Sequence, residues 1–166
     1  MNEDCAFDCS NCELDCSLKK VKLVMRATTD YNKLVPFFIE NEIEYSGEEP
    51  VSTDIVKCWE VTRQSDGKLL GACVLAIREG EFIIDGIAIN TNYRKEKLGK
   101  LLLEKAIKEV RELDGSSIYL VARAPEFFRK AGFKAIESDK APQFFECLTC
   151  PQYGVGCHPE IMKLEV

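Results

Sequence analysis

The chain has 166 residues, of which 46% are hydrophobic and 30% are charged, and it contains nine cysteines and one histidine. This composition is typical of one compact globular domain. The formal net charge of -6 disfavours nonspecific binding to nucleic acid, and no apolar run approaches the about 18 residues of a membrane-spanning helix. The first residues are acidic where a secretory signal is basic, so we expect a cytoplasmic protein that binds neither nucleic acid nor membrane.

Alternating apolar residues predict four strands in the first half of the chain, with one helix after the first of them. Asp30 is typical of a helix N-cap, and we expect this helix to run to about Glu44. The run from Gln64 to Gly67 is typical of a β-hairpin turn, and residues 78–81 form a second turn, so the last three strands are expected to be antiparallel. The expected strands are residues 21–27, 56–61, 70–77 and 82–89.

The most informative segment is residues 87–103, where an apolar strand is followed by a basic turn and the start of an amphipathic helix. A helix N-terminus presents unpaired backbone N–H groups and a partial positive charge, so it can hold phosphate oxygens. Gly99 would let a ligand approach the backbone closely. The segment therefore predicts an anion site, with a solvated, salt-bridged helix start as the alternative. The basic side chains of this turn are Arg94, Lys95, Lys97 and Lys100.

The second half of the chain follows the same rules. Apolar residues at helical spacing from Leu98 to Val110 give this helix one buried face, and Gly115 marks its end. Two further strands are expected at residues 118–121 and 161–166. A short helix is expected at residues 125–131, with a proline at its start and a glycine just past its end.

This order of elements resembles the GNAT superfamily of N-acetyltransferases over residues 21–137, with Tyr93-Arg94 and Gly99 on its cofactor signature and Phe127-Phe128-x-x-x-Gly132-Phe133 on its last helix. The resemblance implies an α/β fold with a mixed, mostly antiparallel sheet flanked by helices, in which the strands at 82–89 and 118–121 splay apart. It implies acetyl-coenzyme A (acetyl-CoA) as cosubstrate, with its pyrophosphate at the basic turn and its pantetheine arm along the freed strand edge. The cofactor-binding residues that it implies are Ile87, Ala88, Ile89, Arg94, Lys95, Glu96, Lys97, Leu98, Gly99 and Lys100.

Lys97 departs from the family signature, which has a glycine at this position. A helical backbone at Lys97 would leave the amides of the turn available for a pyrophosphate. A positive φ is costly for a lysine and would count against cofactor binding.

The resemblance also implies direct acetyl transfer from a thioester to a neutral amine, with a carboxylate on the strand at 82–89 as the base. Asp85 is the first candidate, because apolar neighbours such as Ile84 raise the pKa of a carboxyl. Glu81, at the strand start, is the second. The alternatives are that Asp85 lies on a solvated face or binds backbone amides, and that Glu81 is only a turn residue.

Family members often use a tyrosine at the position of Phe128 to protonate the leaving thiolate. Phenylalanine cannot donate a proton, so water, Tyr119, Tyr153 or another group takes this role, or the activity is weak.

Residues 121–133 resemble in particular the N-acetylglutamate synthase branch of the family. This implies a small-molecule acceptor that is an α-amino acid such as glutamate, with its carboxylate held by Arg123. A surface ion pair of Arg123 with Glu126 or Asp114 is the alternative.

Seven of the nine cysteines form two clusters whose spacings suit a soft metal, so zinc or an iron–sulfur cluster is a candidate cofactor. The first cluster shares one stripe if its segment is helical, and His158 is a candidate ligand beside the second. Packed or oxidised thiols are the alternative. Cys58 and Cys73 lie within strand patterns and are expected to be inert core residues. The clustered cysteines are Cys5, Cys9, Cys12, Cys16, Cys147, Cys150 and Cys157.

Two functional hypotheses follow. The first is an acetyl-CoA-dependent N-acetyltransferase of a small amine or amino acid, acting as a monomer or homodimer. The second is a metal- or redox-sensing cysteine module on a degenerate acetyltransferase core, for which Lys97 and Phe128 would be the signs. The expected organisation is a Cys-rich extension at residues 1–20 and a single domain at 21–166, with a second Cys-rich segment at 147–158.

Overall fold

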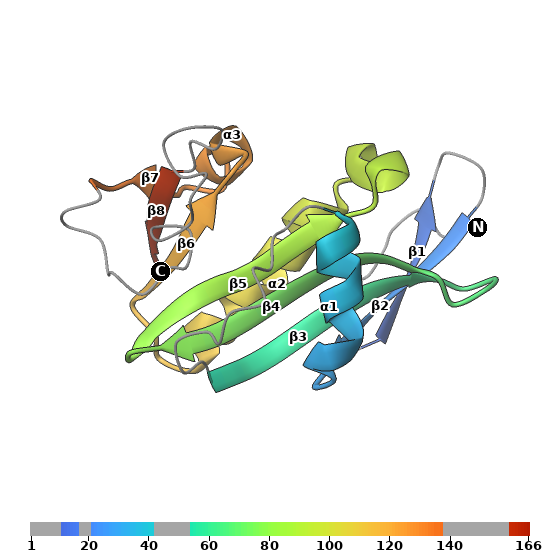
Figure 1. Cartoon of the computed structure of the whole chain (residues 1–166), viewed down its shortest axis with the longest axis horizontal. Coiled ribbons are helices and arrows are strands. Elements are labelled where there is room, and N and C mark those ends of the chain that lie inside the picture. Colours follow the sequence, from blue (N-terminus) through green and yellow to red (C-terminus); the bar gives the residue numbers. More distant parts are fainter. Residues whose placement is uncertain (1–10, 17–20, 42–53, 138–159) are drawn as a thin grey trace.

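The computed structural model describes residues 11–16, 21–41, 54–137 and 160–166. These residues form one sheet with the strand order β1-β2-β3-β4-β5-β6-β8-β7 (Figure 1). Every neighbouring pair in it is antiparallel except β5 and β6, which are parallel. A mixed, mostly antiparallel sheet flanked by helices confirms the predicted fold class. In this described part of the chain, no helix combines the length and the apolar character that a bilayer span requires.

The strands are β1 (Asn11–Cys16), β2 (Val21–Thr28), β3 (Asp54–Arg63), β4 (Leu69–Arg78), β5 (Glu81–Ile89), β6 (Ser117–Ala122), β7 (Lys134–Ala135) and β8 (Glu160–Glu165). The helices are α1 (Tyr31–Glu40), the 3₁₀ helix η1 (Thr91–Glu96), α2 (Leu98–Glu112) and α3 (Pro125–Arg129). The predicted order of elements is confirmed, and β1, β7 and η1 are additions that the sequence analysis did not predict.

Two of the differences have local causes. Helix α1 ends at Glu40 rather than near residue 44, because Asn41 caps it: its side-chain amide donates to the carbonyl of Phe37 at 2.9 Å. Residues 11–16 form a strand that pairs with β2, so the helical stripe considered for the first cysteine cluster is wrong at Cys12 and Cys16. Pairing with β2 satisfies the backbone of this segment without a helix.

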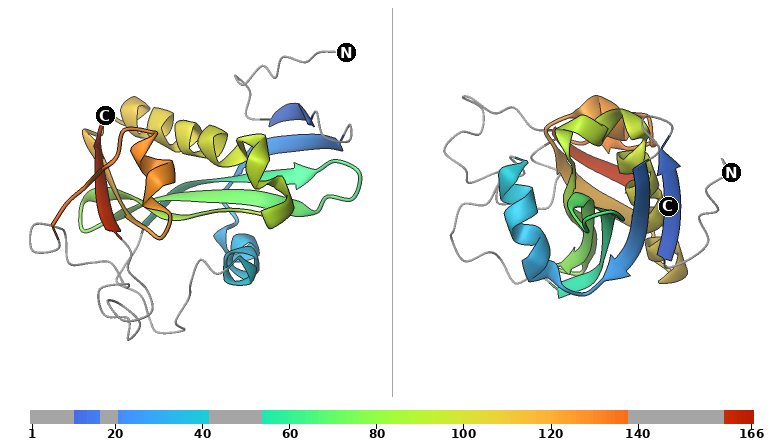
Figure 2. Two further views of the ribbon diagram at one scale, coloured as in Figure 1. Left: turned by 90° about the horizontal axis from the view of Figure 1, so that it is seen from above. Right: turned by 90° about the vertical axis from the view of Figure 1, so that its right-hand side faces the viewer.

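Helices α1 and α2 cover opposite faces of the sheet (Figure 2). Alternation along β4 divides its side chains between them: Ala72 and Val74 pack with α1, whereas Cys73 and Leu75 pack with α2. The α1 residues in the first cluster are Leu34, Phe37 and Phe38. The α2 residues in the second, larger cluster are Leu98, Leu102, Leu103, Ala106, Ile107 and Val110.

Cys58 and Cys73 are fully buried free thiols, one in each of these clusters. Burial raises the pKa of the Cys58 thiol to about 11 and raises the pKa of Cys73 as well. Both thiols therefore stay protonated at neutral pH, where a thiolate would be needed for reaction. The prediction that they are inert core residues is confirmed.

Two contacts fix α1 on the sheet. Its first turn carries Lys33, whose Nζ atom lies 2.5 Å from the carboxylate of Glu60, a buried residue of β3. Farther along the helix, the ring of Phe38 lies against Gly86 of β5, where an added Cβ would come within 3.1 Å of two ring carbons. The second contact needs a glycine and holds α1 beside the middle of β5.

Replacing Gly86 with alanine should lower the free energy of unfolding by about 1–3 kcal/mol, because the new methyl group overpacks against the Phe38 ring. Chemical denaturation measures this loss. Trimming Phe38 to leucine in the same chain should recover part of it, so the double variant should be less destabilised than the sum of the single changes. Strictly additive effects would show that another neighbour limits the space at Gly86.

Candidate active site

Strands β5 and β6 pair over only two residues. Phe82 pairs with Ile118 and Ile83 with Tyr119, and the ladder between these strands ends there. The other edge of β5 pairs with β4 as far as Ile89. On its other edge, strand β6 pairs with β8 over its whole length. The two parallel strands therefore diverge after Ile83, which is the predicted splay.

Asp85 is the extra residue of a β-bulge in β5. Val74 pairs with Gly86, and Leu75, the next residue of β4, pairs with Ile84, so Asp85 has no opposite residue in the described β4–β5 ladder. A bulge bends its strand and can redirect a side chain. Asp85 lies two residues beyond Ile83, the last position that pairs with β6. The bulge thus places a carboxylate at the point where the two strands begin to diverge.

An arginine of the neighbouring strand holds the Asp85 carboxylate. The guanidinium of Arg78, at the end of β4, donates to Oδ1 of Asp85 at 3.0 Å, and the exposed fractions of the two side chains are only 5% for Arg78 and 20% for Asp85. Asp85 is therefore not on a fully solvated face, which was one of the alternatives from sequence.

Burial raises the pKa of Asp85, whereas the charge and hydrogen bond of Arg78 and the hydrogen bond of Tyr31 lower it. Burial is the largest cause, so the pKa lies above the ordinary value for an aspartate. A carboxylate with a raised pKa is a stronger base than one with the ordinary value.

Glu81, the second candidate base, lies at the start of β5 opposite Arg78. It lies four positions before Asp85 along the strand, a distance of roughly 13 Å. It lies at the paired end of β5, before the point of divergence, and is partly exposed. The structure therefore brings Asp85, but not Glu81, to the diverging part of the strand.

The predicted basic turn follows β5 directly. Asn90 ends the strand, with its N–H donating to the carbonyl of Leu70 at 2.7 Å and its side chain accepting from the N–H of Asn92 at 3.0 Å. Residues 94–96 complete η1, and α2 begins immediately after Lys97. The side chain of Lys97 makes no capping hydrogen bond. The first amides of α2 are thus left as donors at the end of the helix dipole.

Lys97 has φ 59° and ψ 20°, in the left-handed region. The sequence analysis took a positive φ at this position as evidence against cofactor binding. The left-handed conformation costs a residue with a side chain about 1–2 kcal/mol. The strain falls on the residue before α2 and removes none of the helix's amide donors. Lys97 and Lys100 are both exposed, so their charges face solvent around the turn.

Gly99, in the first turn of α2, is covered by Phe127 from α3. A Cβ at Gly99 would lie 3.1 Å and 3.3 Å from two carbons of the Phe127 ring. The space that was expected to admit a ligand is therefore filled by protein on this side. Gly99 lets α3 approach the start of α2, and its backbone N–H still belongs to the helix N-terminus.

Phe128 occupies the position of the family tyrosine and is buried, with its ring edge-on to Phe127 and Phe133. Tyr119, one of the proposed substitutes, lies beside Lys163, whose Nζ is 5.4 Å from its ring centre. The other, Tyr153, lies outside the described residues.

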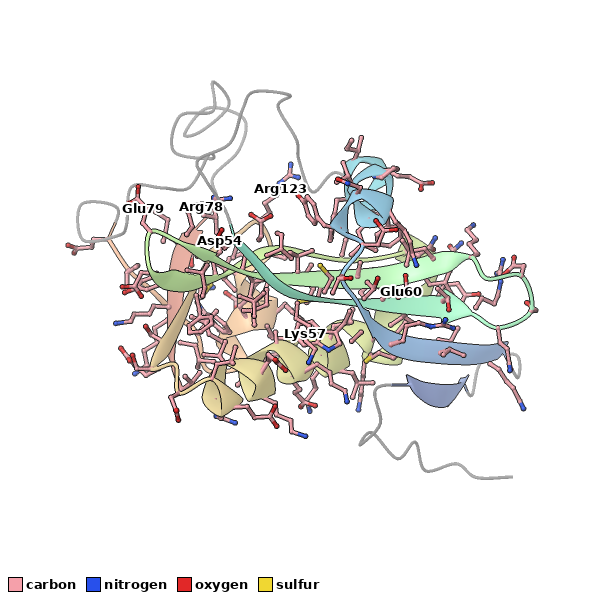
Figure 3. The ribbon with its side chains drawn as sticks, turned by 90° about the horizontal axis from the view of Figure 1, so that it is seen from below. Asp54, Lys57, Glu60, Arg78, Glu79 and Arg123 are labelled. Carbon is pink, nitrogen blue, oxygen red and sulfur yellow. The ribbon has the colours of Figure 1, made fainter. Side chains whose placement is uncertain are left out.

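Arg123 follows β6 directly and is exposed. Figure 3 shows its side chain on the same side of the sheet as α1 and Arg78, whereas Lys57 lies on the side of α2. Glu126, one of the partners expected for a surface pair, binds Arg129 instead. Arg123 is therefore positioned on the face that carries Arg78 and Asp85.

The cysteine clusters fall largely outside the described part of the chain. Cys5, Cys9, Cys147, Cys150, Cys157 and His158 are all outside it, and only the backbone of Cys12 and Cys16 belongs to a described strand. Among the residues that the structure describes, no group of three histidine, cysteine or acidic side chains is placed to hold a metal ion. The prediction of zinc or an iron–sulfur cluster gains no support from them.

Arg78 is a site residue that the sequence analysis missed. Arg78 lies two, four and six residues after Ala76, Val74 and Ala72, so strand alternation places it on their face of β4. That pattern is a signal, but it gives only the face and not the partner on β5.

Comparisons with known proteins agree with this geometry. Residues 29–133 match the model of the acetyltransferase (GNAT) family. An uncharacterised N-acetyltransferase of Chlorobaculum tepidum is 28% identical over 89 residues, and the match covers 52% of this chain and 57% of that protein. The chain thus spans little more than half the length of this curated relative.

Solved structures share the fold at low sequence identity. A GNAT-family acetyltransferase of Staphylococcus aureus Mu50 has a TM-score of 0.61 at 17% identity, with 85% of this chain and 98% of that one covered. The N-acetylglutamate synthase of Neisseria gonorrhoeae, complexed with coenzyme A and N-acetylglutamate, has a TM-score of 0.60 at 18% identity, with 86% of this chain and 35% of that one covered. Because the family match extends over most of the chain, from Thr29 to Phe133, the protein belongs to the GNAT family of acetyltransferases.

Proposed function

We propose that this protein transfers the acetyl group of acetyl-CoA to the amine of a small molecule, and that the acceptor is an α-amino acid such as glutamate. The observation that carries the proposal is the position of Asp85, on a bulge at the point where β5 leaves β6. Asp85 lies on the strand that leads to the cofactor turn. Arg123 lies on the same side of the sheet as Arg78, the partner of Asp85.

The residues of the turn suit the diphosphate of coenzyme A. The amides of Leu98, Gly99 and Lys100 begin α2, and the N-terminal end of a helix favours an anion. The charges of Lys97 and Lys100 add to this preference. The edge of β5 that faces away from β4, at Ile87 and Ala88, would pair with the amides of the pantetheine arm. Acetyl-CoA bound in this way supplies the activated acetyl group.

In the reaction, the amine nitrogen forms a bond to the thioester carbon and the carbon–sulfur bond breaks. The amine must lose a proton to attack, and Asp85 accepts it, directly or through water. The departing thiolate takes up a proton from water or a nearby donor, since Phe128 cannot supply one. Because Asp85 must be ionised, activity should fall as the pH is lowered through its raised pKa.

Two observations support an amino acid as the acceptor. Arg123 lies on the same side of the sheet as Arg78, where a carboxylate on the acceptor would meet a guanidinium (Figure 3). The synthase of Neisseria gonorrhoeae, which is similar to this chain in fold, was solved with N-acetylglutamate bound. The acceptor would bind on the α1 side of β5, with its amine directed to Asp85.

Calorimetric titration of the purified protein with acetyl-CoA, followed by measurement of coenzyme A release with a panel of amino acids and polyamines, tests this function. We expect binding in the micromolar range, typical of enzyme cosubstrates, and the fastest release of coenzyme A with an acidic amino acid such as glutamate. Folded protein that neither binds acetyl-CoA nor releases coenzyme A would contradict the proposal. Faster release with polyamines would retain the transferase and reject the amino-acid acceptor.

Asp85→Asn should lower kcat at least 100-fold, the usual contribution of a positioned base, and should leave the affinity for acetyl-CoA within about twofold. Glu81→Gln, on the same strand, is the matched control and should retain near-normal turnover. Asp85→Asn also weakens the contact with Arg78, at a cost of about 1.5–3 kcal/mol, so thermal unfolding should be recorded beside the kinetics. Equal activity in Asp85→Asn and wild type would reject Asp85 as the base.

Gly99→Ala should weaken acetyl-CoA binding, because its methyl group pushes the Phe127 ring and shifts the start of α2. Combining it with Phe127→Leu should restore binding, since a leucine leaves room for the methyl group. Titration calorimetry on the two single variants and the double variant decides. A double variant that binds as poorly as Gly99→Ala would mean that the ligand, and not Phe127, needs the space at Gly99.

A further inference from the structure

One side chain of the β3–β4 hairpin contacts the cofactor turn. Arg63, the last residue of β3, donates from Nη1 to the hydroxyl of Tyr93 at 3.2 Å. Tyr93 lies in η1, four positions before Lys97. This hydrogen bond therefore joins the hairpin to the segment that leads into the first amides of α2.

The Arg63 side chain and backbone are both held by the hairpin itself. Its N–H donates to the carbonyl of Lys68 at 2.8 Å, and its carbonyl accepts from the N–H of Gly67 at 2.7 Å. The carboxylate of Asp66 accepts from Nε at 2.9 Å and from Nη2 at 2.6 Å, in the paired geometry of an arginine with a carboxylate. The guanidinium is therefore oriented by Asp66, and Nη1 is the nitrogen that it presents to Tyr93.

The segment that contains Tyr93 leads to a strained residue. Lys97 has the left-handed φ of 59°, and such a backbone persists only where its surroundings fix it. On the far side of Lys97, its carbonyl accepts from the N–H of Leu101 at 3.2 Å and so closes the first turn of α2. On the near side, the half-buried ring of Tyr93 packs against the larger core cluster, and Arg63 binds its hydroxyl.

We propose that Arg63 is a positioning residue for acetyl-CoA, which acts through the Tyr93 hydroxyl to keep η1, Lys97 and the first amides of α2 in the arrangement that binds the diphosphate. This inference rests on the proposed binding of the diphosphate at this turn. It gives the β3–β4 hairpin a role in cofactor affinity. Neither side chain is expected to touch the reacting atoms, so the effect falls on binding and not on turnover.

The expected effect of Arg63 is geometric and not electrostatic. Asp66 pairs with the guanidinium through two nitrogens, so the pair presents no net charge to a ligand. The hydrogen bond to Tyr93 is the contact that reaches η1. Removal of the whole Arg63 side chain and removal of the Tyr93 hydroxyl alone should therefore have the same consequence.

Tyr93→Phe and Arg63→Met each remove this hydrogen bond, and calorimetric titration with acetyl-CoA measures the result. We expect the dissociation constant to rise about three- to tenfold in either variant, the equivalent of one hydrogen bond. It should rise no further in the double variant, because both changes remove the same contact. KM for acetyl-CoA should rise by the same factor, and kcat should stay within about twofold.

Arg26→Met is the matched control, because it removes one positive charge from an exposed arginine of β2 and should leave acetyl-CoA affinity unchanged. Two outcomes would overturn the role of Arg63. One is an unchanged affinity in both folded single variants. The other is a double variant that binds more weakly than either single variant, because Arg63 would then act through a group other than Tyr93.

Amide hydrogen exchange, followed by NMR in the free protein, separates this inference from the proposed function. The N–H of Leu101, bonded to the Lys97 carbonyl, should exchange faster in both variants than in wild type. The N–H of Gly115, bonded at the far end of α2, should exchange at the wild-type rate. Unchanged exchange at Leu101 would overturn the hold of Arg63 on the turn, whereas a wild-type protein that does not bind acetyl-CoA would overturn the proposed function.

Discussion

The divergence of β5 from β6 is the constraint on which the rest of the site depends. Parallel pairing ends at Ile83, and the bulge at Asp85 follows at once, so β5 bends at the same place where it loses its neighbour. The bend leaves one edge of the strand for a ligand and turns a carboxylate toward the α1 side. Without the divergence, Asp85 would be an ordinary strand residue and the turn at Lys97 would be an ordinary helix start.

Close packing, more than ligand contact, accounts for the small residues around this site. Gly86 admits the ring of Phe38, and Gly99 admits the ring of Phe127. The first contact ties α1 to the bulge, and the second ties α3 to the cofactor turn. Two aromatic rings from opposite faces of the sheet thereby fix the elements that would meet the acceptor and acetyl-CoA. The distances in this site are therefore set by the core, which deforms little.

Within the described residues, the buried charged side chains of Glu60 and Arg78 each pair with a residue of a different element. Arg78 and Asp85 join β4 to β5, and Lys33 and Glu60 join α1 to β3. Burial raises the pKa of Asp85 above the ordinary value, and the neighbouring Arg78 guanidinium holds the carboxylate in place.

The sequence by itself determined the order of the elements, the faces of the helices and strands, the basic turn before α2 and the carboxylate on β5. Each of these features follows from the spacing of residues that are close together in the chain. It could not reveal the bulge at Asp85, the left-handed backbone at Lys97 or the pairing of β1 with β2. It also gave no sign that Arg78 pairs with Asp85. Only the tertiary structure decided these features, since each depends on the register between segments that are distant in the chain, and periodicity specifies the face of a residue but not its partner.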